Sequence, residues 1–246
     1  MEVRLVSYSV ADKKFIEQYC DEAGLRPRSG PNKHKDVPKF DSILELIAFC
    51  ARVSNPSNQA NEQTSAKLIK YLIKHQHWSP LEMVNACLEI NTTRDIAHQI
   101  VRHRSFAFQE FSQRYAKPED MGDAFILCEA RFQDEKNRQN SIEIDSDNVE
   151  HLGIINRWEE IQQDVIYTTK RAYDWAISVG IAKEQARKVL PEGLTKTRLY
   201  MNGSLRSWVH YIDLRGGHGT QKEHMEIAHA CAKVIAEIFP IINELE

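Results

Sequence analysis

Residues 99–115 have the sequence QIVRHRSFAFQEFSQRY, which gathers guanidinium, imidazole, carboxylate and hydroxyl groups in one short connection. Arg102, His103 and Arg104 stand in a row where the preceding helical pattern ends. After an aromatic run, Glu110, Ser112 and Arg114 occupy alternate positions, and alternate side chains of an extended segment point to one side. Arginine presents a planar fork that suits phosphate and carboxylate groups. The stretch therefore predicts a site for an anionic ligand.

A purely structural interpretation accounts for part of this stretch. Cations near the last turn of a helix complement the helix dipole, which would explain Arg102 and Arg104. This interpretation does not explain why the hydrogen-bonding residues Glu110, Ser112 and Arg114 follow the aromatic run at alternate positions.

Composition restricts the classes of protein to consider. The 246 residues suffice for one substantial domain that buries roughly 70–75% of its unfolded surface, although length alone is compatible with two domains. A net charge of −3 gives no overall reason to expect binding to nucleic acid or to a membrane. The five cysteines are scattered without a CxxC pair, which indicates a reduced, cytoplasmic protein. The N-terminus lacks the layout of a signal peptide, and no apolar run reaches membrane-spanning length.

Upstream of the opening stretch, the pattern predicts short elements in close succession. Val3 and Leu5 suggest a first strand, and residues 25–40 carry prolines, a glycine and cations that predict a loop-rich insertion. Helices are expected from Asp41–Ser42 to a stop before Pro56, and over residues 64–75.

The segment directly before the opening stretch predicts a capped turn, a strand and a helix. Ser79-Pro80-Leu81-Glu82 has the sequence of a capping box. Residues 84–90 alternate as in a strand with one polar face that includes Glu89. Thr92 or Thr93 should begin the helix that continues to Arg104.

Downstream, long helices dominate the pattern. Residues 119–150 predict a second loop-rich insertion, and residues 151–179 predict one long helix that Gly180 ends. Its apolar set includes Ile155, Trp158, Ile161, Val165, Ala172 and Trp175. Shorter helices are expected over 183–191, 204–215 and 221–239. The expected architecture is α+β: one helix-rich domain over residues 1–246 with a small, mostly antiparallel sheet.

The predicted helix over residues 204–215 has two distinct faces. Arg206, His210 and Asp213 fall at i, i+4 and i+7 and share one face, while Trp208 and Tyr211 pack elsewhere. Arg215 comes at the helix end, where a cation also has a purely structural role.

The opening stretch resembles the signature of the flavin-dependent thymidylate synthases, Arg-His-Arg followed by seven residues and Ser. Here Arg102–Arg104 precede Ser105–Phe111 and Ser112. The family usually has Ser at the position of Ala107 and Asn at that of Gln109. The resemblance continues in family order through Ala51–Ser54, His75–Glu82, Ala186–Pro191, Ser204–Arg215 and residues 220–227, TQKEHMEI.

This resemblance implies an enzyme that makes dTMP from dUMP without a cysteine nucleophile. Methylenetetrahydrofolate supplies the carbon, and FAD reduced by NADPH supplies the hydride. Arg215 matches the catalytic guanidinium that stabilises negative charge on the pyrimidine. The residues that match the dUMP site are Gln99, Arg102, Glu110, Phe111, Ser112, Gln113, Arg114, Arg187 and Arg215, of which Arg114 and Arg187 are expected to bind the phosphate.

The residues that match the FAD site are Ser79, Arg102, His103, Arg104, Glu110, Ser204, Arg206 and His210. Ser204 stands where the family typically has Asn, and Ser54, His77 and Glu82 form a second group of FAD candidates. No metal site is expected. The resemblance further implies a homotetramer whose sites are built from more than one subunit.

Two other classes of protein fit parts of the sequence. Phe106, Phe108 and Phe111 beside the cations would suit a single-stranded nucleic acid, but no basic stripe accompanies them. Asp95-x-x-His98 and Glu226-x-x-His229 have the spacing of di-metal carboxylate sites. Two further carboxylates that such a site needs are not evident, and Arg102 lies close by in the sequence.

Overall fold

The computed structural model describes residues 2–25, 40–217 and 219–244. Most of the predicted insertion over 25–40 lies outside these ranges. The helices are α1 (Lys13–Glu22), α2 (Ile43–Ala51), α3 (Ser65–Lys74), α4 (Arg94–Ile100), α5 (Val149–Ser178), α6 (Lys183–Ala186), α7 (Leu205–Gly216) and α8 (Lys222–Ile238). The strands are β1 (Glu2–Tyr8), β2 (Asn85–Thr93), β3 (Ala107–Glu110), β4 (Arg131–Gln133), β5 (Ser141–Glu143) and β6 (Lys196–Ser204). Short 3-10 helices are η1 (Pro56–Asn58), η2 (Ser79–Met83), η3 (Pro118–Met121), η4 (Arg187–Val189) and η5 (Pro240–Glu244).

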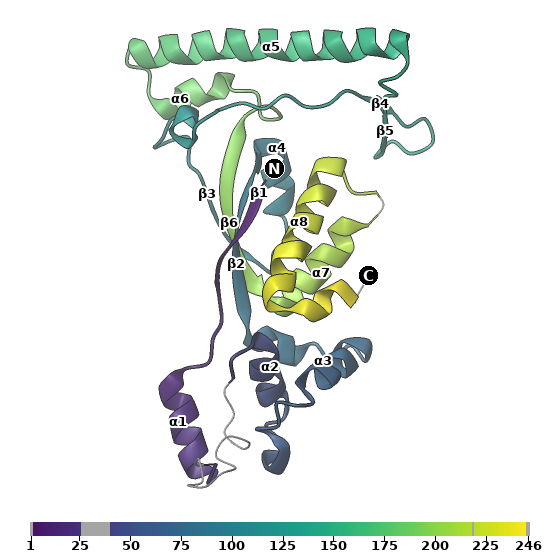
Figure 1. Ribbon diagram of the computed structural model, residues 1–246. Coiled ribbons are helices and arrows are strands. Elements are labelled where there is room, and N and C mark those ends of the chain that lie inside the picture. Colours follow the sequence, from purple (N-terminus) through teal and green to yellow (C-terminus); the bar gives the residue numbers. More distant parts are fainter. Residues whose placement is uncertain (1, 26–39, 218, 245–246) are drawn as a thin grey trace. The chain divides into compact units, whose positions relative to one another are not determined.

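The fold is α+β and helix-rich with a small antiparallel sheet, as the sequence predicts (Figure 1). The larger sheet has the strand order β1-β2-β6-β3, and β4 and β5 form a separate two-stranded sheet. In the smaller sheet Arg131 pairs with Glu143 and Gln133 pairs with Ser141. None of the described helices is long and apolar enough to cross a membrane.

The chain divides into two compact units. The first contains Met1–Arg4, Glu89–Met201 and Leu214–Ala230, and the second contains Leu5–Leu88, Asn202–Asp213 and Cys231–Glu246.

In the first unit, α5 is the longest helix, and residues 119–143 form the loop-rich excursion that the sequence predicts (Figure 1). Tyr173 and Ala176 of α5 pack with Ala186 and Leu190 in a buried cluster. Gly180 adopts a φ of 86° directly after the helix, a left-handed conformation that ends it as expected.

Much of the predicted apolar set of α5 does not reach this cluster. The exposed fractions are 42% for Trp158, 39% for Ile161, 40% for Val165 and 62% for Trp175. The helix therefore carries an apolar surface that the single chain leaves exposed to solvent.

The predicted polar face of β2 needs a correction at Glu89. This carboxylate is only 6% exposed because Arg4 Nε (3.1 Å) and the Tyr200 hydroxyl (3.0 Å) donate to it. A buried charge requires such partners, and here neighbouring strands supply them.

In the second unit, α2 begins at the predicted cap. The Ser42 hydroxyl accepts from Glu45 N (3.3 Å), and the Glu45 carboxylate accepts from Ser42 N (3.0 Å), which completes a capping box. Helix α1, which the sequence analysis did not predict, begins at Asp12, whose carboxylate accepts from Phe15 N.

Helix α7 has the two faces that its spacing predicts. Trp208 and Tyr211 are buried, whereas Arg206, His210 and Asp213 are exposed. The Trp208 indole donates to the carbonyl of Ala86 (3.0 Å), which anchors the buried face on β2.

Candidate functional site

The Arg-His-Arg segment lies in a turn that directly follows helix α4. The predicted helix was to continue to Arg104, but α4 ends at Ile100 with Val101 as its C-cap. His103 N donates to the carbonyl of Ile100 (3.1 Å), which closes the turn. Arg102 and Arg104 are exposed and His103 is half-buried, so the two guanidiniums are accessible to a ligand.

His103 pairs with the last turn of α7. Arg215 Nε donates to His103 Nε2 at 2.9 Å, although 112 positions separate the two residues in sequence. Burial and the Arg215 charge lower the pKa of His103. An acceptor at Nε2 requires the proton to be at Nδ1, so the imidazole is neutral and the cation of this pair is Arg215.

A chain of polar side chains continues from this pair, from the buried His224 of α8 through the half-buried Gln99 of α4 to the exposed Gln221. His224 is fully buried, and its Nδ1 lies 3.3 Å from Gln99 Oε1. Gln99 Nε2 donates to Gln221 Oε1 at 2.7 Å. The imidazoles of His103 and His224 are nearly perpendicular, with centroids 6.3 Å apart. Burial, Arg215 and His103 lower the pKa of His224 to about 4.

Glu110 ends strand β3 with a fixed carboxylate. Its Oε1 accepts from Arg94 Nη1 (3.2 Å) and from the Thr197 hydroxyl (2.8 Å). Both bonds reach the same oxygen, which leaves Oε2 for a further donor. Glu110 is among the residues that the sequence predicts for the site, whereas Arg94 and Thr197 are not.

The expected alternation of Glu110, Ser112 and Arg114 ends at Glu110. Phe111 N still donates to the carbonyl of Arg198 (2.8 Å), but Tyr115 N turns back to the carbonyl of Ser112 (3.1 Å). Ser112 and Arg114 therefore lie in a turn instead of the extended segment that their alternation predicts.

The other predicted dUMP residues also belong to the first unit. Arg114 Nε lies 3.6 Å from Glu184 in an exposed ion pair, and Arg187 is half-buried in η4. Gln113 is only 3% exposed, and its Nε2 lacks a hydrogen-bond partner among the described residues.

A second group of predicted residues lies within the second unit. Arg206 Nη1 donates to Glu82 Oε1 at 2.7 Å, and Ser204 is buried, with its hydroxyl 3.2 Å from that of Ser207. The Ser204 hydroxyl and the Arg206 guanidinium lower the pKa of Glu82. The His210 ring lies edge-on to Trp78, with centroids 4.5 Å apart.

The predicted capping box at Ser79 is absent. Residues Ser79–Met83 form the 3-10 helix η2 without a side-chain cap, because the Glu82 carboxylate binds Arg206 instead. Ser79 is exposed, as are the further candidates Ser54 and His77.

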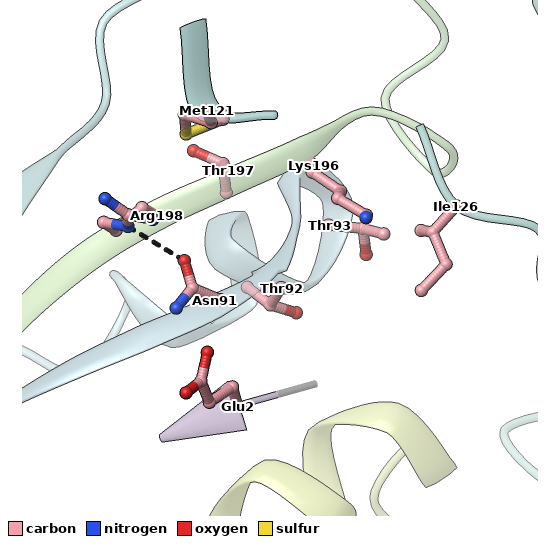
Figure 2. A pocket seen from close by; sticks show the side chains of 9 residues that line it. All are labelled: Glu2, Asn91, Thr92, Thr93, Met121, Ile126, Lys196, Thr197 and Arg198. Carbon is pink, nitrogen blue, oxygen red and sulfur yellow. Dashed lines mark hydrogen bonds between the residues drawn. The ribbon is translucent and has the colours of Figure 1, made fainter. Parts of the chain in front are cut away.

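Two hollows of the first unit contain none of the predicted site residues. A pocket of about 330 Å³ has residues of β2 and β6, together with Glu2, Met121 and Ile126, as its lining. Figure 2 shows these residues, among which Arg198 Nε donates to Asn91 Oδ1 (2.9 Å). Thr197, which binds Glu110, is part of its wall. A larger groove of about 1190 Å³ has α5, residues 126–144 and the start of α8 as its lining.

The residues of the di-metal alternative make separate contacts. His98 Nδ1 lies 3.5 Å from Glu192, and His229 Nε2 lies 3.2 Å from the carbonyl of Gly216. Within residues 2–25, 40–217 and 219–244, His, Cys, Asp and Glu do not form a cluster of three or more that could hold a metal ion.

Comparisons with known proteins agree over most of the chain. The family model described as thymidylate synthase complementing protein matches residues 39–241. A probable flavin-dependent thymidylate synthase of Paramecium bursaria Chlorella virus 1 is 46% identical over 207 residues, which is 84% of this chain and 91% of that protein. The flavin-dependent thymidylate synthase of a Synechocystis species is 48% identical over 198 residues, 80% of this chain and 86% of that protein. The chain therefore belongs to the family of flavin-dependent thymidylate synthases.

A solved structure shares the fold at low identity. The UMP/dUMP methylase PolB from Streptomyces cacaoi, solved with 5-Br dUMP, has a TM-score of 0.72 and 20% sequence identity. The match covers 99% of this chain and 93% of that chain.

Proposed function

We propose that this protein is a flavin-dependent thymidylate synthase that converts dUMP to dTMP. Methylenetetrahydrofolate is the carbon donor, and NADPH is the reductant. The observation that carries the proposal is the Arg215–His103 pair, a guanidinium positioned by a neutral imidazole at the end of α7. Membership of the family supports the same reaction.

Arg215 is the catalytic residue in this proposal. Methylation at C5 of the pyrimidine requires electron density to move into the ring, and negative charge develops on its O2/N3 edge. A guanidinium near this edge stabilises that charge. Because His103 is a neutral acceptor, it orients Arg215 without a competing positive charge.

The dUMP residues support a nucleotide site within the first unit. Arg114 and Arg187 bind the phosphate, since bidentate guanidiniums suit phosphate oxygens. The Arg114–Glu184 contact is exposed and long at 3.6 Å, and such a pair contributes little stability. A phosphate can therefore displace Glu184. Glu110 Oε2 and Gln99 offer acceptors and donors to the ribose and base.

The residues present also fit a flavin dinucleotide. In the first unit, Arg102 and Arg104 are exposed guanidiniums that suit a pyrophosphate. In the second unit, Arg206 is exposed and His210 lies beside an aromatic ring. FAD, when bound and reduced, supplies the hydride for the reaction. Glu82 holds Arg206 in one orientation before the cofactor binds, because their ion pair is short.

The assembly and location form part of the proposal. The exposed apolar residues of α5 support a homotetramer in which several chains complete each site. The two units act as one catalytic domain, because one family match spans residues 39–241 across both. The five free cysteines support a reducing, cytoplasmic location.

An absorption spectrum of the purified protein with added FAD, before and after dUMP, tests the proposal. Oxidised-flavin bands should appear and shift when dUMP binds against the ring. An assay with dUMP, methylenetetrahydrofolate and NADPH should then yield dTMP. A protein that takes up no FAD and forms no dTMP would contradict the proposal.

A further inference from the structure

We propose that His224 is a positioning residue for dUMP, which fixes the side-chain amide of Gln99 through a hydrogen bond from its Nδ1–H. This inference rests on the proposed function, because Gln99 is one of the proposed dUMP residues. His224 itself is not among the candidate site residues, and it lies on the first turn of α8, inside the protein.

The direction of each hydrogen bond follows from its partner. Gln99 Nε2 donates to Gln221 Oε1 at 2.7 Å, so the other end of the Gln99 amide is the carbonyl oxygen. That oxygen lies 3.3 Å from His224 Nδ1 and can only accept. The proton of His224 is therefore at Nδ1.

Burial makes this arrangement rigid. The His224 side chain is 0% exposed, so it has little freedom to move away from Gln99. A neutral imidazole is also the form that its surroundings favour, since the Arg215 cation lies nearby. The Gln99 amide thus keeps one orientation, with its carbonyl oxygen towards His224 and its Nε2 towards Gln221, the residue directly before α8.

This orientation decides what Gln99 can offer to a nucleotide. The amide nitrogen has two N–H donors, and the bond to Gln221 uses one. The second remains for an acceptor on dUMP. If the amide rotated, its carbonyl oxygen would meet that acceptor instead, which would remove a donor and oppose two oxygen atoms.

Replacements of His224 separate this role from packing. Asn places an amide nitrogen where histidine has Nδ1, whereas Gln places it where histidine has Nε2. His224→Asn should retain the dUMP dissociation constant within about threefold, while His224→Gln and His224→Ala should raise it about tenfold, the scale of one buried hydrogen bond. The kcat should change less than the KM for dUMP, because the bond contributes to binding in ground and transition states alike.

A double-mutant cycle provides the sharpest control. In a Gln99→Ala background, His224→Ala should weaken dUMP binding no further, since its effect passes through Gln99. Thermal unfolding of every variant measures packing separately. Histidine NMR of the wild type should show His224 neutral with its proton at Nδ1.

The outcomes distinguish this inference from the proposed function. A wild type that neither binds dUMP nor forms dTMP overturns both. An active wild type overturns the inference alone if His224→Gln binds dUMP as well as His224→Asn does. The same holds if His224→Ala still weakens binding without Gln99, or if the proton of His224 is at Nε2. The inference is supported if His224→Asn retains dUMP binding and if the effects of His224→Ala and Gln99→Ala on dUMP binding are not additive.

Discussion

At the scale of single residues, the site is defined by groups that fix one another's hydrogen-bonding roles. Arg215 can only donate, so His103 must accept, and both imidazoles near Arg215 stay neutral. The positive charge of this group of side chains is thereby confined to the Arg215 guanidinium, which is the proposed catalytic group.

Replacement of Arg215 tests the proposed catalytic role. Arg215→Ala should reduce dTMP formation by at least about a hundredfold, the typical loss when one charge-stabilising donor is removed. Flavin should remain bound, because Arg215 is not among the FAD residues. Product assay and the absorption spectrum measure the two properties separately. Turnover close to the wild-type rate would contradict the role.

Thr197 provides a test of how Glu110 is held. Thr197→Val retains the shape of a buried side chain but removes the hydroxyl that donates to Glu110 at 2.8 Å. We expect the KM for dUMP to rise about fivefold, which corresponds to one hydrogen bond of about 1 kcal/mol.

Thr195→Val is the matched control for this replacement. Thr195 is also buried, but its hydroxyl donates to the carbonyl of Pro191 (2.6 Å) and not to Glu110. It should lower stability and leave the KM unchanged. Equal KM changes in both variants would contradict a role in positioning Glu110.

The sequence was sufficient to propose the residues that bear charge but not the residues that hold them. Arg102, Glu110 and Arg215 belong to recognisable motifs. Arg94 and Thr197 carry no motif. Thr197 reaches Glu110 through the pairing of β6 with β3, whereas Arg94 reaches it from the start of α4. His224 lay in a block that resembles the family, yet only its burial beside Gln99 indicates a role.

At the scale of elements, periodicity predicts most helices but not α1, and it predicts the strands incompletely. Helix α3 and α5 begin and end within two residues of their predicted bounds. Strand β6 was missed although Thr197, Leu199 and Met201 are buried in strict alternation, because charged residues and a glycine interrupt its apolar character. The capping box predicted at Ser79 does not form, because the carboxylate of Glu82 binds Arg206, which is distant in sequence.

The capping box of α2 gives a prediction at this scale. Ser42→Ala removes the acceptor for Glu45 N and should lower the free energy of unfolding by about 1 kcal/mol. Asp41→Ala, at the exposed neighbouring position, should change stability much less. Urea denaturation measures both. Equal losses in the free energy of unfolding for the two variants would contradict a stabilising role of the Ser42 cap.

At the scale of the whole molecule, α5 is the element through which we propose that chains associate. A single chain leaves large apolar side chains of this helix in water, which is typical of an interaction surface. Trp175→Glu should therefore dissociate the proposed tetramer, as measured by sedimentation. Lys170→Glu on the same helix also changes charge and should leave it assembled. A wild-type monomer would contradict the proposed assembly.

Stability should also depend on pH through His224. Its pKa is about 4 in the folded chain and about 6.5 when unfolded, so the unfolded state binds more protons between these values. The free energy of unfolding therefore does not depend on His224 titration above about pH 6.5, and it decreases as the pH falls from about 6.5 towards about 4.

Urea unfolding at about pH 7.5 and about pH 5 checks this dependence. The wild type should lose more stability between the two conditions than His224→Asn, which does not titrate. An equal loss in both proteins would contradict the assignment.

The four tryptophans occupy three different environments. Trp208 is fully buried, Trp158 and Trp175 are exposed on α5, and Trp78 lies beside His210. Fluorescence can therefore follow three events without a label. Trp208 emission should report unfolding, a blue shift of the α5 indoles should report association, and quenching of Trp78 should report the arrival of flavin.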